Sequence, residues 1–400
     1  MAAAGITASS EVSILGTAEG LDALAPEWDA LMAAMPRPSP FLSHTWVTTW
    51  WRHFGGSSRL LVVTLRSAEG ELVGVAPLHV ASRRVAGLPV RALEFLGYRG
   101  SAVCTDHLDF LARGPERHAA VARMFEALVQ EPSWDTMALA DIAEDSPLRA
   151  VAAAVRLPHV ALPAEICYYR PLFGSAGEFA AAIRQEHPNL ASMLRRRRKR
   201  LAQHPDSRFV ATVDGGAEIA TVMGELARLH GLARNRQGQS GNFCRPDYRA
   251  FHDDVALKLA ASGRLYLARW QFEGRIAAVL YGLVEGGVLY FYQSGFDTAL
   301  GSHGLGTVLM GDVMEDAAGR LGLREFDFLR GDEEYKTRWT SLARTTWTVH
   351  VWRQCWRGTA ARAAWHAARG LAGARAWAAR RWRKFAQPVQ GGAAAREEAV

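Results

Sequence analysis

The chain has little cysteine, and its four cysteines are scattered at positions 104, 167, 244 and 355. No two of them stand at the spacing of a zinc or redox motif, so we expect no metal site, no disulfide and reduced thiols. No run of eighteen apolar residues occurs, which excludes a transmembrane helix. The first eleven residues also lack the basic start and the sustained apolar stretch of a secretory signal. These absences predict a cytoplasmic protein.

Acidic residues are scarce in one part of the chain only. Residues 336–400 hold thirteen Lys or Arg against two Asp or Glu, whereas residues 1–335 carry a net charge of −4. The overall charge of +7 therefore describes the C-terminal segment and does not indicate a general nucleic-acid-binding surface. A content of 49% hydrophobic and 22% charged residues is typical of a globular protein and excludes disorder for most of the chain. Because 400 residues exceed what one core usually organises, we expect two domains or two fused halves.

The first half is predicted to mix several strands with a few helices. Ser43 is expected to cap a helix whose Trp and Phe residues pack onto a sheet. A hairpin is expected with its second strand interrupted at Pro77, since proline donates no hydrogen bond to a ladder. Residues 157–171 show less pattern and are expected to lead into the second half. The other predicted elements are strands at 91–96, 107–111 and 136–140 and a helix at 116–130.

The second half is predicted to place helices before a strand meander. A glycine-rich turn, a helix and a further strand follow the meander, and then the polar cluster 330–339. The expected helices are 176–203, broken near Pro188, 216–232 and 247–261, and the expected strands are 264–270, 276–284, 288–293 and 323–329. Beyond Thr348 we expect an Ala- and Arg-rich helix over about 358–385, whose tryptophans do not share one face.

The glycine turn at Gly301, Gly304 and Gly306 joins a buried strand to a helix start. Small residues let a ligand approach the backbone closely, and the first helical N–H groups point at one spot, where an anion such as a pyrophosphate is stabilised. The alternative is a tight turn in which glycine serves only the backbone dihedrals. We expect a phosphate cofactor to bind here.

The polar cluster after the last strand supplies acids and bases. A strand carboxylate such as Asp327 acquires a raised pKa if it is buried without a partner, which suits a general base. The alternative is a structural ion pair with Arg330 or Arg338. No cysteine lies in this region of the sequence, so a covalent cysteine intermediate has no support.

Four segments, 41–55, 74–78, 292–297 and 326–339, resemble the GCN5-related N-acetyltransferase superfamily, specifically its BioF2-like or CelD-like branch, which is related to the FemAB peptidyltransferases. The resemblance spans roughly residues 40–345. It implies a mixed α/β (α+β) fold of tandem GCN5-like halves, 1–165 and 166–350, followed by a helical tail, 351–400. The superfamily's phosphate loop usually starts with Gln or Arg, whereas position 301 is Gly here.

The resemblance implies an acyltransferase that uses acetyl-CoA or another acyl-CoA and no metal. We expect it to acylate an amine or hydroxyl of a polar acceptor, a saccharide in envelope or exopolysaccharide synthesis being one candidate. The expected cofactor-binding residues are Gln293, Ser294, Ser302, His303, Gly304, Leu305, Gly306 and Thr307. The expected catalytic residues are Asp327, with Asp332, Glu333 and Glu334 as rival bases, and Tyr335 as proton donor. The expected substrate-binding residues are Arg330, Lys336, Arg338 and Trp339.

Two other functions stay open. FemAB relatives use aminoacyl-transfer RNA, and the six consecutive basic residues 195–200 could contact such a polyanion, although a solvated helix surface is the plainer interpretation. A non-catalytic GCN5-like module that binds a partner through its basic tail is the other alternative. Peripheral membrane contact by the tail is not favoured, because its tryptophans do not form an apolar stripe.

Overall fold

The computed structural model describes residues 10–98, 103–211, 216–236 and 241–385. The strands are β1 (Glu11–Leu15), β2 (Arg59–Arg66), β3 (Leu72–Val85), β4 (Leu88–Phe95), β5 (Leu111–Ala112), β6 (Thr136–Ile142), β7 (His159–Pro171), β8 (Arg208–Ala211), β9 (Leu265–Phe272), β10 (Arg275–Glu285), β11 (Val288–Phe296), β12 (Glu325–Arg330) and β13 (Ala343–Trp352). They form one mixed sheet in the order β1-β2-β3-β4-β6-β13-β7-β12-β11-β10-β9-β8, with β5 beside β3.

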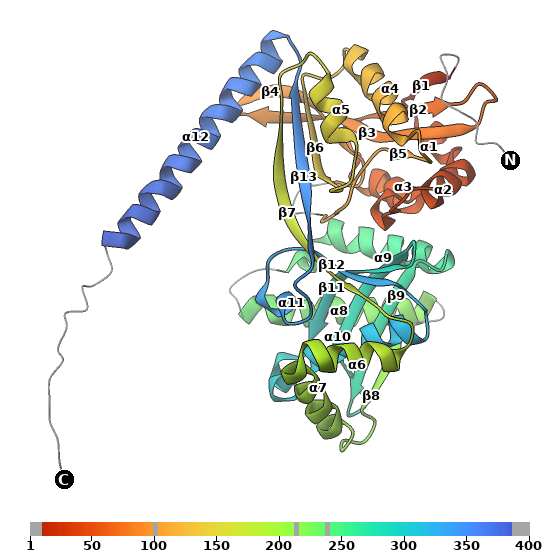
Figure 1. Cartoon of the computed structure of the whole chain (residues 1–400), viewed down its shortest axis with the longest axis vertical. Helices are drawn as coiled ribbons and strands as arrows, with labels where there is room; N and C mark the ends of the chain where they lie inside the picture. The colour runs from red at the N-terminus through yellow and green to blue at the C-terminus, as the bar shows by residue number, and fades with distance from the viewer. Residues whose placement is uncertain (1–9, 99–102, 212–215, 237–240, 386–400) are drawn as a thin grey trace.

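Helices cover both faces of this sheet. The α-helices are α1 (Ala18–Asp22), α2 (Ala25–Ala33), α3 (His44–Phe54), α4 (Arg117–Gln130), α5 (Leu148–Ala154), α6 (Ala176–Glu186), α7 (Pro188–Leu201), α8 (Gly216–Arg236), α9 (Pro246–Ala261), α10 (Leu305–Gly319), α11 (Glu334–Thr337) and α12 (Trp356–Phe385). Three 3₁₀ turns are η1 (Pro40–Leu42), η2 (Asn242–Cys244) and η3 (Thr298–His303). Figure 1 shows two lobes, with β1 to β6 in the upper lobe and β8 to β12 in the lower one.

Helix α3 begins as predicted and ties the two lobes together. The Ser43 hydroxyl accepts the amide of Trp46 at 3.2 Å, which satisfies one of the free N–H groups at the helix start. Trp46 is fully buried and meets the rings of Phe41 and Phe251 edge-on, each at 5.1 Å between ring centroids. Since Phe251 belongs to α9, the aromatic side of α3 packs between the lobes.

Two predictions about the upper strands are wrong. Strand β3 runs without a break through Pro77, which pairs with Val62 of β2. On the side of β3 away from β2, the Pro77 carbonyl accepts the amide of Leu96. The pairing of β3 with β4 ends at Leu78 and Phe95, so no hydrogen bond of the sheet is lost because proline lacks an N–H group. The strand expected at 107–111 is reduced to a single bridge at Leu108 and to the short β5.

The segment expected to be a plain connection is the long strand β7, and it runs between the lobes beside β13 (Figure 1). β13 pairs with β6 on one side and with β7 on the other, and β7 in turn pairs with β12. The sheet is therefore continuous from one lobe to the other. The predicted boundaries at 165 and 350 fall inside β7 and β13.

Strands β11 and β12 diverge, and this divergence positions the site. They pair in parallel over only three residue pairs, the last being Tyr290 with Asp327. β11 then continues along β10 to Phe296, whereas β12 turns toward β7, where Arg330 pairs with Cys167. Helices α8 and α9 lie against one face of this part of the sheet, and α6, α7 and α10 cover the other.

Helix α12 extends away from the two lobes in Figure 1. Its first turns are anchored, because the buried Ala361 packs with Val90 and Trp352 and Trp365 contacts this cluster. The predicted C-terminal helix is thus present, beginning at Trp356. Within the part of the chain that the structure describes, no helix has the length and hydropathy needed to cross a bilayer.

Candidate active site

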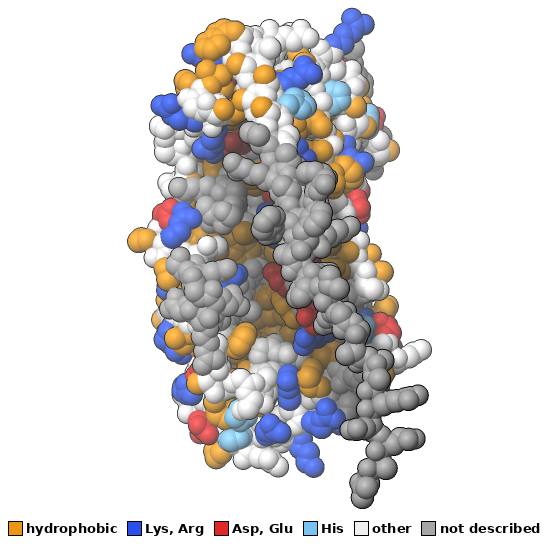
Figure 2. Space-filling view, turned by 90° about the vertical axis from the view of Figure 1, so that its left-hand side faces the viewer, with side chains coloured by type: hydrophobic (Ala, Val, Ile, Leu, Met, Phe, Trp, Pro, Cys, Tyr) orange, Lys and Arg blue, Asp and Glu red, His pale blue; other side chains and the backbone are white. Residues whose placement is uncertain are grey.

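A cavity of about 840 Å³ opens where β11 and β12 diverge. Its walls come from both strands, from the start of α10, from α7, α8 and η2, and from residues of the upper lobe. Figure 2 shows a hollow at mid-height of the molecule, floored by hydrophobic side chains and edged by charged ones. The cavity therefore joins segments that lie far apart in the sequence.

The glycine turn forms one end of the cavity. Gly304 adopts the left-handed conformation, with φ of +63°, and begins α10 without a side-chain cap. Among the residues that the structure describes, none accepts a hydrogen bond from the amides of Leu305 or Gly306. These two unpaired N–H groups at the positive end of a fifteen-residue helix are suited to an anion.

Helix α7 brings cationic groups to this turn. The guanidinium of Arg197 lies directly against Gly304, since a Cβ atom added there would be 2.3 Å from its carbon. Arg198 fixes α7 to α10 through Asp312 at 2.5 Å and Glu315 at 2.9 Å. The basic run is therefore only partly a solvated surface, because Arg197 lines the cavity and Arg198 is an interhelix anchor.

Six of the eight predicted cofactor-binding residues line the cavity. They are Gln293, Ser294, Gly304, Leu305, Gly306 and Thr307. Ser302 and His303 are not among the lining residues. The His303 ring instead packs against Phe272 and His204, at 5.1 and 5.4 Å between centroids, on the outer side of η3.

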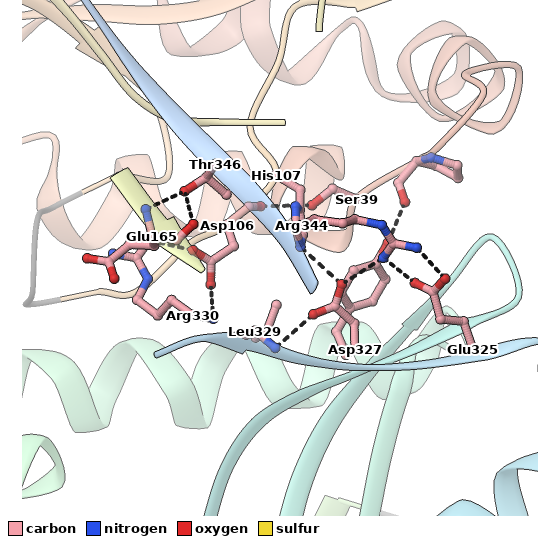
Figure 3. Close-up of polar contacts among 12 residues, drawn as sticks. Ser39, Asp106, His107, Glu165, Glu325, Asp327, Leu329, Arg330, Arg344 and Thr346 are labelled. Atoms are coloured by element: carbon pink, nitrogen blue, oxygen red, sulfur yellow. Dashed lines mark hydrogen bonds and ion pairs between the residues drawn. The ribbon is translucent and has the colours of Figure 1, made fainter. Parts of the chain in front are cut away.

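Asp327 lies outside the cavity lining, in the buried polar network of Figure 3. Its carboxylate meets Nε2 of His107 at 3.0 Å and accepts the amide of Leu329 at 2.7 Å, and Arg344 lies 3.5 Å away. Burial opposes ionisation, but His107 and these hydrogen bonds hold the pKa of Asp327 below its usual value. The condition for a raised pKa, burial without a partner, is thus not met. The carboxylate forms the ion pair of the alternative, with His107 and Arg344 in place of Arg330 or Arg338.

Arg330 connects the two lobes. Its guanidinium lies 2.8 Å from Asp106 and 2.7 Å from Asp141, and it also donates to the carbonyl of Thr105. The backbone amide of Arg330 donates to Asp106 as well (Figure 3). Burial raises the pKa of Asp141 to about 6, against the opposing pull of Arg330. Arg330 lines the cavity, yet its Nη2 group is directed at Thr105, Asp106 and Asp141.

Lys336 is buried, and its ammonium group is hydrogen-bonded to backbone carbonyls. Its ammonium donates to the carbonyls of Leu329, Arg330 and Gly331, and it also pairs with Glu333 at 2.9 Å. This cation therefore holds the chain in place just after β12. The ammonium group directs its donors at the protein rather than at a ligand.

The remaining predicted residues divide between cavity and surface. Glu333, Tyr335, Arg338 and Trp339 line the cavity, and Asp332 does not. Arg338 is exposed and pairs with Glu334 at 3.2 Å. Although 37% of the Tyr335 side chain is exposed, desolvation raises the pKa of its hydroxyl, so this group is protonated at neutral pH.

Sequence reasoning missed the side of the cavity that faces the upper lobe. Its residues are Cys104, Asp106 and Glu165 from that lobe and His230, Arg234 and Asn242 from α8 and η2. Cys104 lines the cavity although it lies far from the polar cluster in the sequence. Burial raises the pKa of its thiol, which disfavours the nucleophilic thiolate. No motif joins these residues, because the fold gathers them from separate segments.

The family comparison matches the segment that builds most of this cavity. Residues 189–337 match the family model described as an acetyltransferase (GNAT) domain. This part of the chain is therefore similar to a GNAT acetyltransferase domain. The comparison with curated proteins found no match.

Solved structures share the fold at low sequence identity. FemX is similar with a TM-score of 0.61 and 11% identity, covering 86% of this chain and 98% of that one. A protein of unknown function from Bacteroides thetaiotaomicron has a TM-score of 0.53 and 11% identity, and the likeness covers 86% of this chain and 100% of that one. The C-terminal domain of a putative lysylphosphatidylglycerol synthetase from Agrobacterium fabrum has a TM-score of 0.50 and 12% identity, and the likeness covers 86% of this chain and 94% of that one. The predicted tandem, FemAB-like fold is confirmed, while the BioF2-like or CelD-like branch stays a prediction.

Proposed function

We propose that the protein transfers an acyl group from a coenzyme A thioester to an amine or hydroxyl of a polar acceptor. The observation that carries this proposal is the divergence of β11 and β12 over the unpaired amides of Leu305 and Gly306. A slot between two strands suits an extended pantetheine arm, and a helix start at its end suits a diphosphate. The match of residues 189–337 to a GNAT domain supports the same activity.

The donor end of the cavity has the charge that a diphosphate needs. The two free amides and the Arg197 guanidinium converge on Gly304. Arg197 supplies from α7 the cation that position 301, a glycine, cannot supply within the loop. Hydrogen bonds to charged groups contribute about 1.5–3 kcal/mol each, so this side chain should contribute strongly to donor affinity.

The reaction also needs a proton for the departing sulfur. The Tyr335 hydroxyl lines the cavity, and its raised pKa keeps it protonated at neutral pH. Among the predicted bases, Glu333 lines the cavity but is 56% exposed and paired with Lys336. Asp327 is enclosed by His107, Leu329 and Arg344, and this placement does not support a role as base.

Transfer of an aminoacyl group is the second candidate function. The fold likeness to FemX and the exposed basic side chains of α7 favour it. A saccharide acceptor remains a prediction from the sequence resemblance alone.

Calorimetry with coenzyme A tests the donor site. Arg197→Glu should weaken binding more than tenfold, because it places a negative charge beside the diphosphate and removes a contact worth about 1.5–3 kcal/mol. The matched control is Arg196→Glu, which changes the neighbouring exposed residue, whose guanidinium contacts Ser192 of its own helix. If both variants bind coenzyme A with equal affinity, the proposed contact between Arg197 and the diphosphate is refuted. Salt-sensitive binding of transfer RNA without coenzyme A affinity would select aminoacyl transfer instead.

A further inference from the structure

His230 is the buried imidazole of the cavity. It lies on α8, is only 5% exposed and lines the cavity together with Tyr292 and Ser294 of β11. It belongs to none of the segments that resemble the acyltransferase superfamily. Its placement therefore comes from the fold and not from a motif.

The backbone fixes the protonation state of this ring. Nδ1 of His230 lies 3.3 Å from the carbonyl oxygen of Ser294. A carbonyl can only accept, so Nδ1 must carry the hydrogen and Nε2 of the neutral ring carries the lone pair. No residue in the described ranges hydrogen-bonds to Nε2. The imidazole is thus held in the tautomer that a proton acceptor requires.

Two glycines make room for the ring. A Cβ atom at Gly295 would lie 2.6 Å from the backbone nitrogen of His230, so α8 reaches β11 this closely only because residue 295 is glycine. A Cβ atom at Gly241 would lie 2.9 Å from Cδ2 and 3.4 Å from Nε2 of the ring. Glycine at 241 therefore keeps a side chain away from the Nε2 edge.

We propose that His230 is the general base of the transfer reaction, taking a proton from the acceptor at Nε2. This assignment rests on the proposed acyl transfer. The acceptor nitrogen or oxygen forms a bond to the thioester carbonyl carbon while the carbon–sulfur bond breaks. His230 takes the acceptor's proton, and Tyr335 gives one proton to the sulfur, so coenzyme A leaves as the thiol. Return of the proton from His230 to Tyr335 through solvent restores both residues and balances the protons.

The charged surroundings of His230 allow it to act at neutral pH. Burial lowers its pKa, the Ser294 carbonyl opposes this shift, and Arg234 one turn along α8 adds to it. The cavity also holds Asp106 and Glu165 from the upper lobe, Arg197 from α7, and Arg330, Glu333 and Lys336 from β12 and the segment after it. The neutral ring therefore predominates above pH 6.5, which is the ordinary pKa of a histidine side chain.

Kinetics of thiol release from acetyl-CoA test the assignment, with 2-aminoethanol as acceptor because it offers both an amine and a hydroxyl. His230→Gln should lower kcat by about 10²–10⁴, the usual contribution of a general base, while leaving coenzyme A affinity unchanged. Wild-type activity should fall as the pH drops through the pKa of His230, and this limb should vanish in the variant. Added imidazole should restore part of the activity of His230→Ala.

His204→Gln is the matched control, because His204 lies outside the cavity lining and pairs with the exposed Glu273. It should keep full activity. If the wild-type protein is active and the turnover of His230→Gln lies within threefold of the wild-type value, the assignment of His230 as base is overturned. The proposed acyl transfer would then still stand. A wild-type protein that neither binds coenzyme A nor releases thiol would refute the proposed function itself. Nitrogen-15 NMR of the wild-type ring must show the hydrogen on Nδ1, and the opposite tautomer would also overturn the assignment.

Discussion

Replacing Arg330 by Met should weaken the junction of the lobes. The substitution leaves Asp106 and Asp141 facing one another without their shared cation, and the two side chains are only 1% and 5% exposed. Removing one partner from a buried ion pair costs about 3–5 kcal/mol, because the remaining charge stays desolvated. The free energy of unfolding should fall by that amount at pH 8.

Acidification should reduce this loss. The folded-state pKa of Asp141 is already about 6, above its ordinary 3.8, and it should rise further once Arg330 no longer favours the carboxylate. An acid with a raised folded pKa gains stability as the pH falls through that pKa, until the unfolded chain also binds the proton. The difference between variant and wild type should therefore be smaller at pH 5 than at pH 8.

Urea unfolding followed by tryptophan fluorescence measures both effects. At a slope of about 3 kcal/mol per molar urea, the midpoint should fall by roughly 1–1.7 M at pH 8. Arg338→Met is the control, because its ion pair with Glu334 is exposed and should contribute less than about 1 kcal/mol. A loss below 1 kcal/mol for Arg330→Met, or a loss that does not depend on pH, would refute the interpretation of Arg330 as a buried connection.

Two further predictions concern the interior and the tail. Asp327→Asn should destabilise the protein by about 3 kcal/mol by isolating His107. Burial opposes protonation of His107, but Asp327 raises the pKa of the ring above 6.5. The stability that this ion pair gives the wild-type protein should therefore be full below pH 6.5 and lost as the pH rises through the raised pKa. Urea titrations of the variant should lack this pH dependence. A chain ending at Arg369 should keep the melting temperature and the turnover of the full chain, whereas one ending at Trp352 should melt lower because Ala361 no longer covers Val90. Loss of turnover in the longer truncation at unchanged melting temperature would instead give the tail a functional role.

Local features of the fold could be predicted because local chemistry determines them. The Ser43 cap, the break at Pro188 and the meander before the glycine turn are each set by a few neighbouring residues. β7 escaped prediction because its two ends lie in different lobes, so its buried residues follow no steady alternation. A strand without that period resembles a connection.

The site could be predicted only on its donor side. The glycine turn and the residues after β12 are contiguous, so the sequence displays them together. His230 and Glu165 reach the cavity from other segments, and Asp327 finds its partner 220 residues away in His107. Arg330 and Arg338 are the ion-pair partners that the nearby sequence offers, yet Arg330 is three residues from Asp327 on the strand and so points to the opposite face.

The position of β13 has a consequence for synthesis on the ribosome. Among the strands that the structure describes, β13 is synthesised last, and it fills the gap between β6 and β7. Until residue 352 has emerged, the nascent chain presents two open sheet edges whose main-chain groups can pair with other chains. We therefore expect premature termination before this strand to yield aggregating products, and the sheet to close only after β13 has emerged from the ribosome.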